Sequence, residues 1–112
     1  MRIVKGIKMK ETITQGTTPT FSFTLPFEAI QIKSFFITFR QGERNVLEKD
    51  LSDCTTEGYE ISVTLSQEET FLFEPNQTVY VQVRMADGEN SAFASPVFAM
   101  HVAPVLKGGD VI

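Results

Sequence analysis

The sequence predicts an all-β domain, an antiparallel sandwich of about seven strands with one short helical turn near residues 66–73. Three observations support this prediction. Apolar and polar residues alternate in several segments, which is typical of strands with one buried face. Turn-forming residues separate these segments at intervals of roughly ten residues. Phenylalanine occurs ten times and tryptophan never, and phenylalanine filling the space between two sheets explains this excess best.

Six segments show the strand pattern. In the first, Phe21, Phe23 and Leu25 alternate with polar residues, so one face is expected to be buried. The last contains Pro96, which cannot donate a hydrogen bond to a neighbouring strand, so we expect a bulge or an edge there. The inward side of the fourth segment is predicted to hold Tyr59, Ile61, Val63 and Leu65. The predicted strands cover residues 20–25, 34–41, 46–51, 59–65, 79–85 and about 92–102.

The residues between the strands favour turns and one helical turn. Ser66 and Glu69 have the spacing of a helix capping box, so a short helix or 3₁₀ turn is expected over residues 66–73. Gly42 lies in a predicted hairpin turn, where it can adopt a positive φ angle. Lys49 lies between two leucines, and an inward-leaning lysine protects an edge strand against pairing with another chain.

The length of 112 residues predicts one domain. Residues 11–104 are expected to form the sandwich and residues 105–112 a C-terminal tail. Residues 1–10 are either an N-terminal extension or a first strand, and both alternatives remain open. The N-terminus has no apolar stretch typical of a signal peptide, and no apolar run approaches the ~20 residues of a membrane-spanning helix. We therefore expect synthesis in the cytoplasm and no membrane partner.

Charge and residue counts argue against most kinds of chemistry. The net charge of −4 and the pI near 4.9 argue against nucleic acid as the main partner, because phosphate binding needs a basic surface. Cys54 is the only cysteine, so no internal disulfide can form. His101 is the only histidine, so no metal site with two histidines is possible, and we expect it on a sheet face. The protein is predicted to need no cofactor or metal and not to be an enzyme.

The remaining chemical candidates have plainer explanations. Cys54 lies beside Asp53 and near Glu57, whose charges should raise the thiol pKa and blunt a nucleophile. The loop 87–90 carries three oxygen-bearing side chains, but it lacks the order of a calcium-binding loop, so a hairpin turn is favoured.

The helical turn and its flanking strands carry a first resemblance. A strand ending at Leu65, the turn beginning at Ser66, and a strand over residues 79–83 resemble the E-to-F crossover of immunoglobulin-like domains. The resemblance implies an immunoglobulin-like sandwich. The paired cysteines and core tryptophan of antibody domains are missing, so only the architecture carries over.

Four segments carry a second, more specific resemblance: residues 15–27 (QGTTPTFSFTLPF), 47–54 (LEKDLSDC), 65–70 (LSQEET) and 105–112 (VLKGGDVI). Together they resemble a family of small proteins encoded in prophages of Gram-positive bacteria, over residues 11–112. The QGTTPT start is also loosely similar to the amino-terminal domain of phage baseplate proteins. The resemblance implies a structural role in a virion or tail, and it brings no catalytic residues.

The outward faces of the strands suggest a binding surface. In an immunoglobulin-like order, strands 34–41 and 79–85 are neighbours, with the last strand beside them. Their outer faces would then gather aromatic residues and arginines, which are enriched at the centres of protein interfaces. The alternative is single exposed apolar residues that need no explanation. The predicted interface residues on this face are Phe36, Arg40, Tyr80, Arg84, Val97 and His101.

The tail is a second interface candidate. Val111 and Ile112 follow the glycine pair 108–109, so this segment could add as a strand to a neighbouring subunit. The alternative is a frayed terminus.

Two functions follow as expectations. The first is a non-enzymatic phage or prophage structural protein, associated with the virion or tail, that assembles with itself or with other phage proteins. The second is a module that binds a carbohydrate or a cell surface by stacking Tyr80 and Phe36 on sugar rings.

Overall fold

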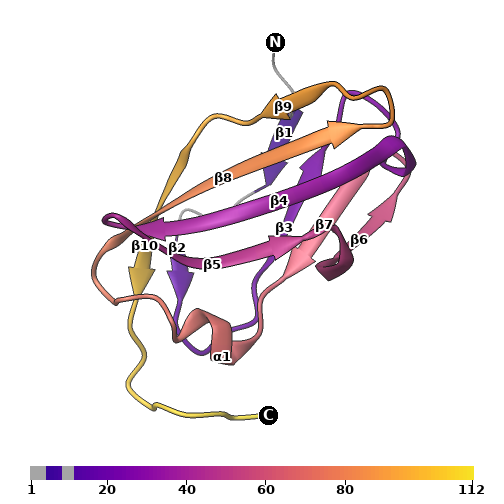
Figure 1. Cartoon of the computed structure of the whole chain (residues 1–112). Helices are drawn as coiled ribbons and strands as arrows, with labels where there is room; N and C mark the ends of the chain where they lie inside the picture. Colours follow the sequence, from indigo (N-terminus) through magenta and orange to yellow (C-terminus); the bar gives the residue numbers. More distant parts are fainter. Residues whose placement is uncertain (1–4, 9–11) are drawn as a thin grey trace.

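The computed structural model describes residues 5–8 and 12–112, which form two β-sheets packed face to face (Figure 1). The four-stranded sheet has the order β1-β3-β7-β6, and the six-stranded sheet has the order β2-β10-β8-β4-β5, with β9 also pairing with β8. The first sheet contains β1 (Lys5–Lys8), β3 (Thr20–Thr24), β7 (Glu60–Thr64) and β6 (Cys54–Glu57). The second contains β2 (Thr12–Thr14), β10 (Phe98–Ala103), β8 (Thr78–Asp87), β4 (Ile32–Gln41), β5 (Arg44–Asp50) and β9 (Ala92–Ala94).

This strand order confirms the predicted immunoglobulin-like sandwich. Strands β1, β3, β7 and β6 correspond to A, B, E and D, and β10, β8, β4 and β5 correspond to G, F, C and C′. Strand β2 pairs with β10 in parallel, whereas the other strand pairs of the described residues are antiparallel. The predicted antiparallel arrangement therefore has one exception, the pair of β2 and β10.

The core lies between the sheets and is rich in phenylalanine, as predicted. Phe21 of β3 contacts Phe39 of β4 with ring centroids 5.7 Å apart, and Phe23 contacts Phe35 at 6.1 Å. These pairs join the two sheets directly. Each buried phenylalanine contributes roughly 1.5–3 kcal/mol through loss of apolar surface from water. The fully buried phenylalanines are Phe21, Phe23, Phe35, Phe39 and Phe73.

The structure has ten strand segments where about seven were predicted. One reason is the predicted last strand over residues 92–102, which breaks into β9 and β10 at Ser95. The Ser95 N–H donates to the Val83 carbonyl oxygen at 2.8 Å, and Ser95 Oγ accepts from the Val83 N–H at 2.9 Å. Pro96 follows at this break, as expected for a residue that cannot continue the ladder.

Tyr59 is a second correction. The alternation predicted that it faces inward with Ile61, but its side chain is 53% exposed. Gly58, with a φ angle of +56°, forms a turn, and β7 begins only at Glu60. The alternating pattern therefore extended one residue beyond the strand.

The helical turn over residues 66–73 is confirmed in part as α1 (Gln67–Thr70). Its capping box is complete, because Ser66 Oγ accepts from the Glu69 N–H at 3.1 Å and Glu69 Oε1 accepts from the Ser66 N–H at 2.8 Å. Glu69 also forms an ion pair with Lys49 of β5. Lys49 thus turns toward the sandwich, as predicted for this edge strand, and ties it to α1. Two 3₁₀ turns complete the connections, at Ala29–Gln31 and Leu51–Asp53.

The segment 15–19, at the start of the specific QGTTPT sequence, packs against α1. The Gly16 N–H donates to Thr70 Oγ1 at 2.9 Å, and Thr70 Oγ1 donates to the Thr17 carbonyl oxygen at 3.2 Å. Gln15 Nε2 donates to the Phe73 carbonyl oxygen at 3.0 Å. These residues hold the connection between β2 and β3 in place, so this part of the sequence serves the fold.

The N-terminal residues divide between two sheets. Lys5–Lys8 form β1 and pair with β3 of the four-stranded sheet, whereas Thr12–Thr14 form β2 of the six-stranded sheet. Residues 1–4 of the predicted extension lie outside the described residues. Within the described part of the chain, no helix is long and apolar enough to cross a membrane.

Candidate functional site: the outer face of the six-stranded sheet

The outer face of the six-stranded sheet is organised by the pairing of β4 with β8. In this register Arg40 lies opposite Tyr80, Thr38 opposite Gln82, and Phe36 opposite Arg84. Because alternate residues of a strand point to the same side, these six side chains share the solvent-facing surface of the two central strands. The predicted neighbourhood of strands 34–41 and 79–85 is therefore correct.

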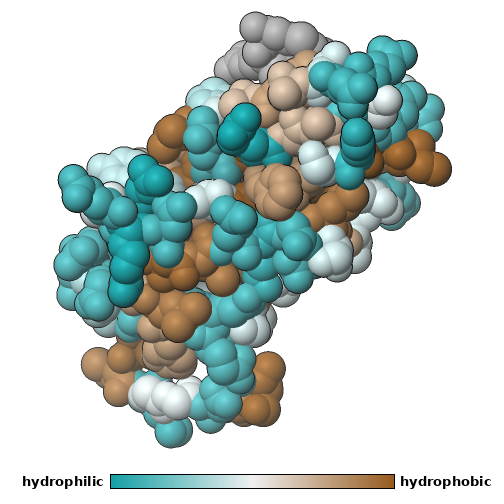
Figure 2. Space-filling model, viewed as in Figure 1, coloured by the Kyte–Doolittle hydropathy of each residue, from teal (hydrophilic) through white to brown (hydrophobic). Residues whose placement is uncertain are grey.

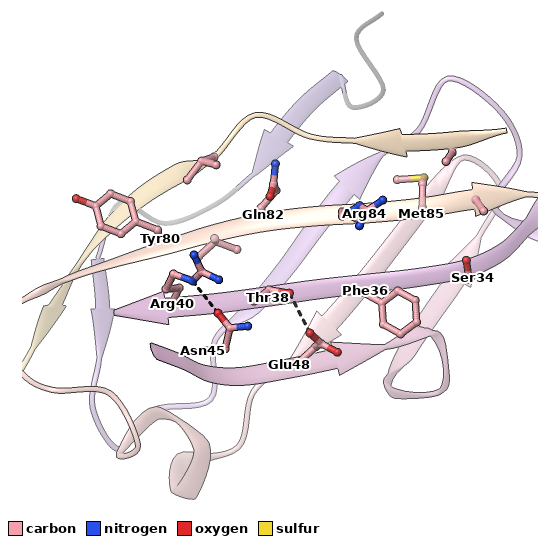
Figure 3. A pocket seen from close by; sticks show the side chains of 14 residues that line it. Ser34, Phe36, Thr38, Arg40, Asn45, Glu48, Tyr80, Gln82, Arg84 and Met85 are labelled. Atoms are coloured by element: carbon pink, nitrogen blue, oxygen red, sulfur yellow. Dashed lines mark hydrogen bonds between the residues drawn. The ribbon is translucent and has the colours of Figure 1, made fainter. Parts of the chain in front are cut away.

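A groove of about 770 Å³ runs along this surface (Figure 3). Tyr80 lies at one end of the groove and Phe36 toward the other, with arginines between them. Tyr80 is 46% exposed and Phe36 is 43% exposed, so both rings present apolar surface to solvent. The volume lies within the ~300–1,000 Å³ range of ordinary ligand sites.

Several polar side chains in the groove are held by neighbours. Arg40 Nε donates to Asn45 Oδ1 at 2.7 Å, and Thr38 Oγ1 donates to Glu48 Oε2 at 3.2 Å (Figure 3). These contacts join β4 to β5 and fix one guanidinium and one carboxylate in position. Gln82 Nε2 donates to the Ser95 carbonyl oxygen at 3.0 Å, which fixes the floor near β9.

Arg84 differs from Arg40. Its side chain is exposed, and it takes part in none of the hydrogen bonds or ion pairs found among the described side chains. It lies between Phe36 on β4 and Ala94 on β9 in the cross-strand register. The small alanine leaves its guanidinium accessible from the groove. Arg84 is therefore the group on this face most available to an anionic partner.

The surface of this face mixes apolar and polar groups, as Figure 2 shows. Arg40 and Arg84 supply two positive charges and Glu48 one negative charge, in a chain whose net charge is −4. The groove is thus locally basic on an acidic protein. This favours a partner with apolar groups and negative charge.

The structure brings together five of the six residues that the sequence predicts for this face: Phe36, Arg40, Tyr80, Arg84 and Val97. His101 is exposed on β10, opposite Thr78, and does not line the groove. Val111 and Ile112 are exposed in the tail, near α1, and are also not part of it.

Sequence reasoning missed the contribution of β5. Asn45 and Glu48 line the groove because β5 pairs with β4 across the hairpin turn that contains Gly42. That turn was predicted, so its register could have placed both residues beside Arg40 and Thr38.

The outer face of the four-stranded sheet is different in kind. Thr20 and Thr64 hydroxyls are hydrogen-bonded to each other at 2.6 Å, and Ser22 and Ser62 at 2.9 Å. These pairs cross from β3 to β7 and satisfy each other. At these positions of β3 and β7 the face therefore offers hydroxyl groups that are already engaged, and the groove is the more suitable binding surface.

The remaining reactive groups serve the fold. Burial raises the pKa of the Cys54 thiol to about 11, and the carboxylates of Asp53 and Asp50 add to this effect. Asp50, and not Glu57 as expected, is the second carboxylate. Asp87 Oδ1 accepts from the N–H groups of Glu89 and Ser91, so this carboxylate closes the predicted turn.

A comparison of the sequence with protein-family models and with curated proteins finds no match. The fold and the groove define an immunoglobulin-like sandwich with one concave face that bears aromatic rings and arginines.

Proposed function

We propose that this chain is a non-enzymatic structural protein of a phage or prophage, associated with the virion or tail after synthesis in the cytoplasm. It acts by protein–protein assembly, with other phage structural proteins or with itself. The groove on the six-stranded sheet is the surface that binds the partner. The phage part of this proposal rests on the resemblance of residues 11–112, and the assembly part rests on the groove.

The observation that carries the binding role is the exposure of two aromatic rings beside two arginines in one groove. Tyrosine and arginine are, with tryptophan, enriched at energetic centres of protein interfaces. Burial of Tyr80 and Phe36 would supply apolar area, and Arg84 would supply a charged hydrogen bond to the partner.

The test is incorporation into particles. Particles from an induced prophage that encodes the chain are purified and analysed by quantitative mass spectrometry, with wild type, Tyr80→Thr and the matched control Tyr59→Thr. Tyr59 is a tyrosine of similar exposure outside the groove. We expect the wild type and the Tyr59 variant in the particles at a fixed ratio, and at least a tenfold loss of the Tyr80 variant. Absence of the wild-type chain from the particles would contradict the phage role.

One observation favours a second function, binding of a carbohydrate or a cell-surface molecule. The exposed rings of Tyr80 and Phe36 flank polar side chains in the groove, an arrangement that can stack on sugars and bond their hydroxyls. A glycan array with the purified chain separates the two functions. Binding to a defined glycan that is lost in Tyr80→Thr and kept in Tyr59→Thr would favour the carbohydrate function.

A further inference from the structure

The C-terminal tail, residues 105–112, carries apolar and charged side chains that complement those of the groove. It forms no strand or helix, and its apolar side chains face solvent: Val111 is 68% exposed and Ile112 is 91% exposed. Leu106 is fully exposed as well. One charged residue of each sign, Lys107 and Asp110, flanks the glycine pair. The tail therefore carries unburied apolar surface and an acidic group near its apolar residues.

The tail is weakly held where it lies. One hydrogen bond joins it to the rest of the described molecule, from the Val111 N–H to Gln67 Oε1 at 3.1 Å. Asp110 lies beside Glu68 of α1. Desolvation, the charge of Glu68 and a side-chain hydrogen bond with it raise the pKa of Asp110. At neutral pH the two carboxylates repel each other. The intramolecular position therefore buries little apolar surface and brings like charges together.

We propose that the tail of one copy of this chain binds in the groove of a second copy. The apolar side chains of Val111 and Ile112 would cover the aromatic rings of the groove, and Asp110 would pair with Arg84. Lys107 would then approach Glu48, the one carboxylate in the groove lining. Both charges of the tail thus meet opposite charges, whereas its present neighbour Glu68 has the same sign as Asp110.

The shape of the groove also favours a tail over a second groove. Two concave faces leave a gap when they meet, whereas an extended segment can lie along one groove. Its backbone N–H and C=O groups then stay within reach of hydrogen-bond partners. Gly109, with a φ angle of +79°, and Gly108 before it allow the tail to change direction after β10.

The proposal rests on the proposed function and names its partner as a second copy. Tail into groove is a heterologous contact, because the two surfaces that meet are different. Such contacts repeat from copy to copy and produce closed rings or open filaments. A chain of 112 residues with one groove and one tail could therefore assemble without further parts.

The test is complementation between two defective chains. The tail variant carries Val111→Ser and Ile112→Ser, and the groove variant carries Tyr80→Thr and Arg84→Thr. All four side chains are exposed, so folding is expected to persist and is checked by circular dichroism. Molar mass is measured by light scattering over a range of concentrations, with Tyr59→Thr as the control.

We expect the wild type and the control to form species larger than a monomer, and each variant alone to remain monomeric. An equimolar mixture of the two variants should form a one-to-one complex, since one chain supplies an intact tail and the other an intact groove. A charge exchange adds a second readout: Asp110→Arg and Arg84→Asp, each defective alone, should recover at least tenfold in affinity when mixed.

Three outcomes would overturn the proposal. Assembly of the tail variant at the wild-type concentration would show that the tail is not the occupant, and the proposed phage role would still be tested by particle incorporation. The wild type could also stay monomeric at every concentration while the tail variant still enters particles. This result would show that the groove binds another protein and not the tail. Assembly of the groove variant would show that the tail binds elsewhere.

Discussion

Gly16 is required both by its backbone conformation and by its close packing against Phe71. Its φ angle is +74°, and a Cβ atom added there would lie 2.9 Å from Cζ of Phe71. A left-handed conformation costs an L-residue about 1–2 kcal/mol, and displacement of the half-buried ring would add to this. We predict that Gly16→Ala lowers the free energy of unfolding by about 2–3 kcal/mol. Urea denaturation measures the change.

Gly58 provides the control for this prediction. Its φ angle is also positive, at +56°, but no atom lies within 4 Å of the position of an added Cβ. Gly58→Ala should therefore cost only the conformational part, about 1–2 kcal/mol. Equal losses for the two variants would show that the contact with Phe71 contributes nothing.

Ser95 follows the end of β9, and its side chain provides a hydrogen-bond acceptor for a backbone N–H of the neighbouring strand β8. Its hydroxyl accepts from the buried N–H of Val83 and donates to the Pro96 carbonyl oxygen at 2.8 Å. Ser95→Ala removes the acceptor and leaves a buried N–H unpaired, so we predict a loss of about 1–3 kcal/mol in unfolding free energy. Ser91→Ala, on an exposed loop, should change it by less than about 0.5 kcal/mol. Thermal unfolding of both variants tests this, and similar midpoints would contradict it.

Individual inward-facing residues were predictable wherever a strand was regular. Phe21, Phe23 and Phe39 follow strict alternation, and the physical cause is the period of two in an extended chain. Tyr59 was not predictable in this way, because a glycine turn ended the period one residue earlier than the apolar pattern did. The role of Ser95 was also hidden, since nothing in its neighbours shows that its hydroxyl replaces a ladder bond.

At the scale of elements, α1 depends on a carboxyl group whose protonation can be followed. Burial alone would raise the pKa of Glu69, but the Lys49 ammonium and the Ser66 N–H outweigh it, so the pKa is lowered. A lowered pKa means that this stabilisation is present above the unfolded pKa and is lost as the pH falls through the folded one.

We therefore predict that Lys49→Met destabilises the protein at pH 7 by up to about 1 kcal/mol. The difference from wild type should shrink between pH 7 and pH 3, because protonation of Glu69 removes the charge that pairs with Lys49. Urea midpoints at the two pH values measure the effect. Lys33→Met is the control, because Lys33 bonds the neutral Asn90 side chain; its effect should not change with pH. A Lys49 difference that is as large at pH 3 as at pH 7 would contradict the assignment.

The existence and type of the longer elements could be predicted from the sequence, whereas the short ones could not. Strands β4 and β8 contain enough residues to show the alternation clearly. The spacing of Ser66 and Glu69 predicts α1. Strands β2 and β9 have three residues each, too few for a periodic signal. They form because the longer strands beside them have unpaired backbone N–H and C=O groups to bond. The sequence of the short segment itself does not show this.

At the scale of the whole molecule, the position of the tail should depend on pH. The pKa of Asp110 is raised when the tail lies beside Glu68. A raised pKa means that docking is most favourable below the pKa of the free carboxyl and weakens as the pH rises through the docked value. We predict that in the monomeric Tyr80→Thr/Arg84→Thr variant, whose groove cannot hold the tail of another copy, the tail is better protected from proteolysis at pH 4 than at pH 7. Adding Asp110→Asn removes the charge, so the tail should be as well protected at pH 7 as it is at pH 4 with Asp110 in place. Equal protection of the tail with Asp110 at both pH values would contradict the prediction.

The groove shows how far sequence reasoning reaches at this scale. An immunoglobulin-like order was enough to place Phe36, Arg40, Tyr80 and Arg84 on one surface, because the pairing of two strands follows from the order. The order could not show that the surface is concave, nor that β5 adds Asn45 and Glu48 to it, because curvature and register depend on the packed sheet. His101 was placed on the correct strand but beyond the end of the groove.

The paired hydroxyls of Thr20 with Thr64 and of Ser22 with Ser62 give the molecule two unlike sides. Each of these four hydroxyls is hydrogen-bonded within its own sheet, so these positions of β3 and β7 offer less to a neighbouring macromolecule than the groove does. A polymer joined through tail and groove would be directional, because every subunit would present its four-stranded sheet in the same orientation and each new subunit would add through a tail or a groove.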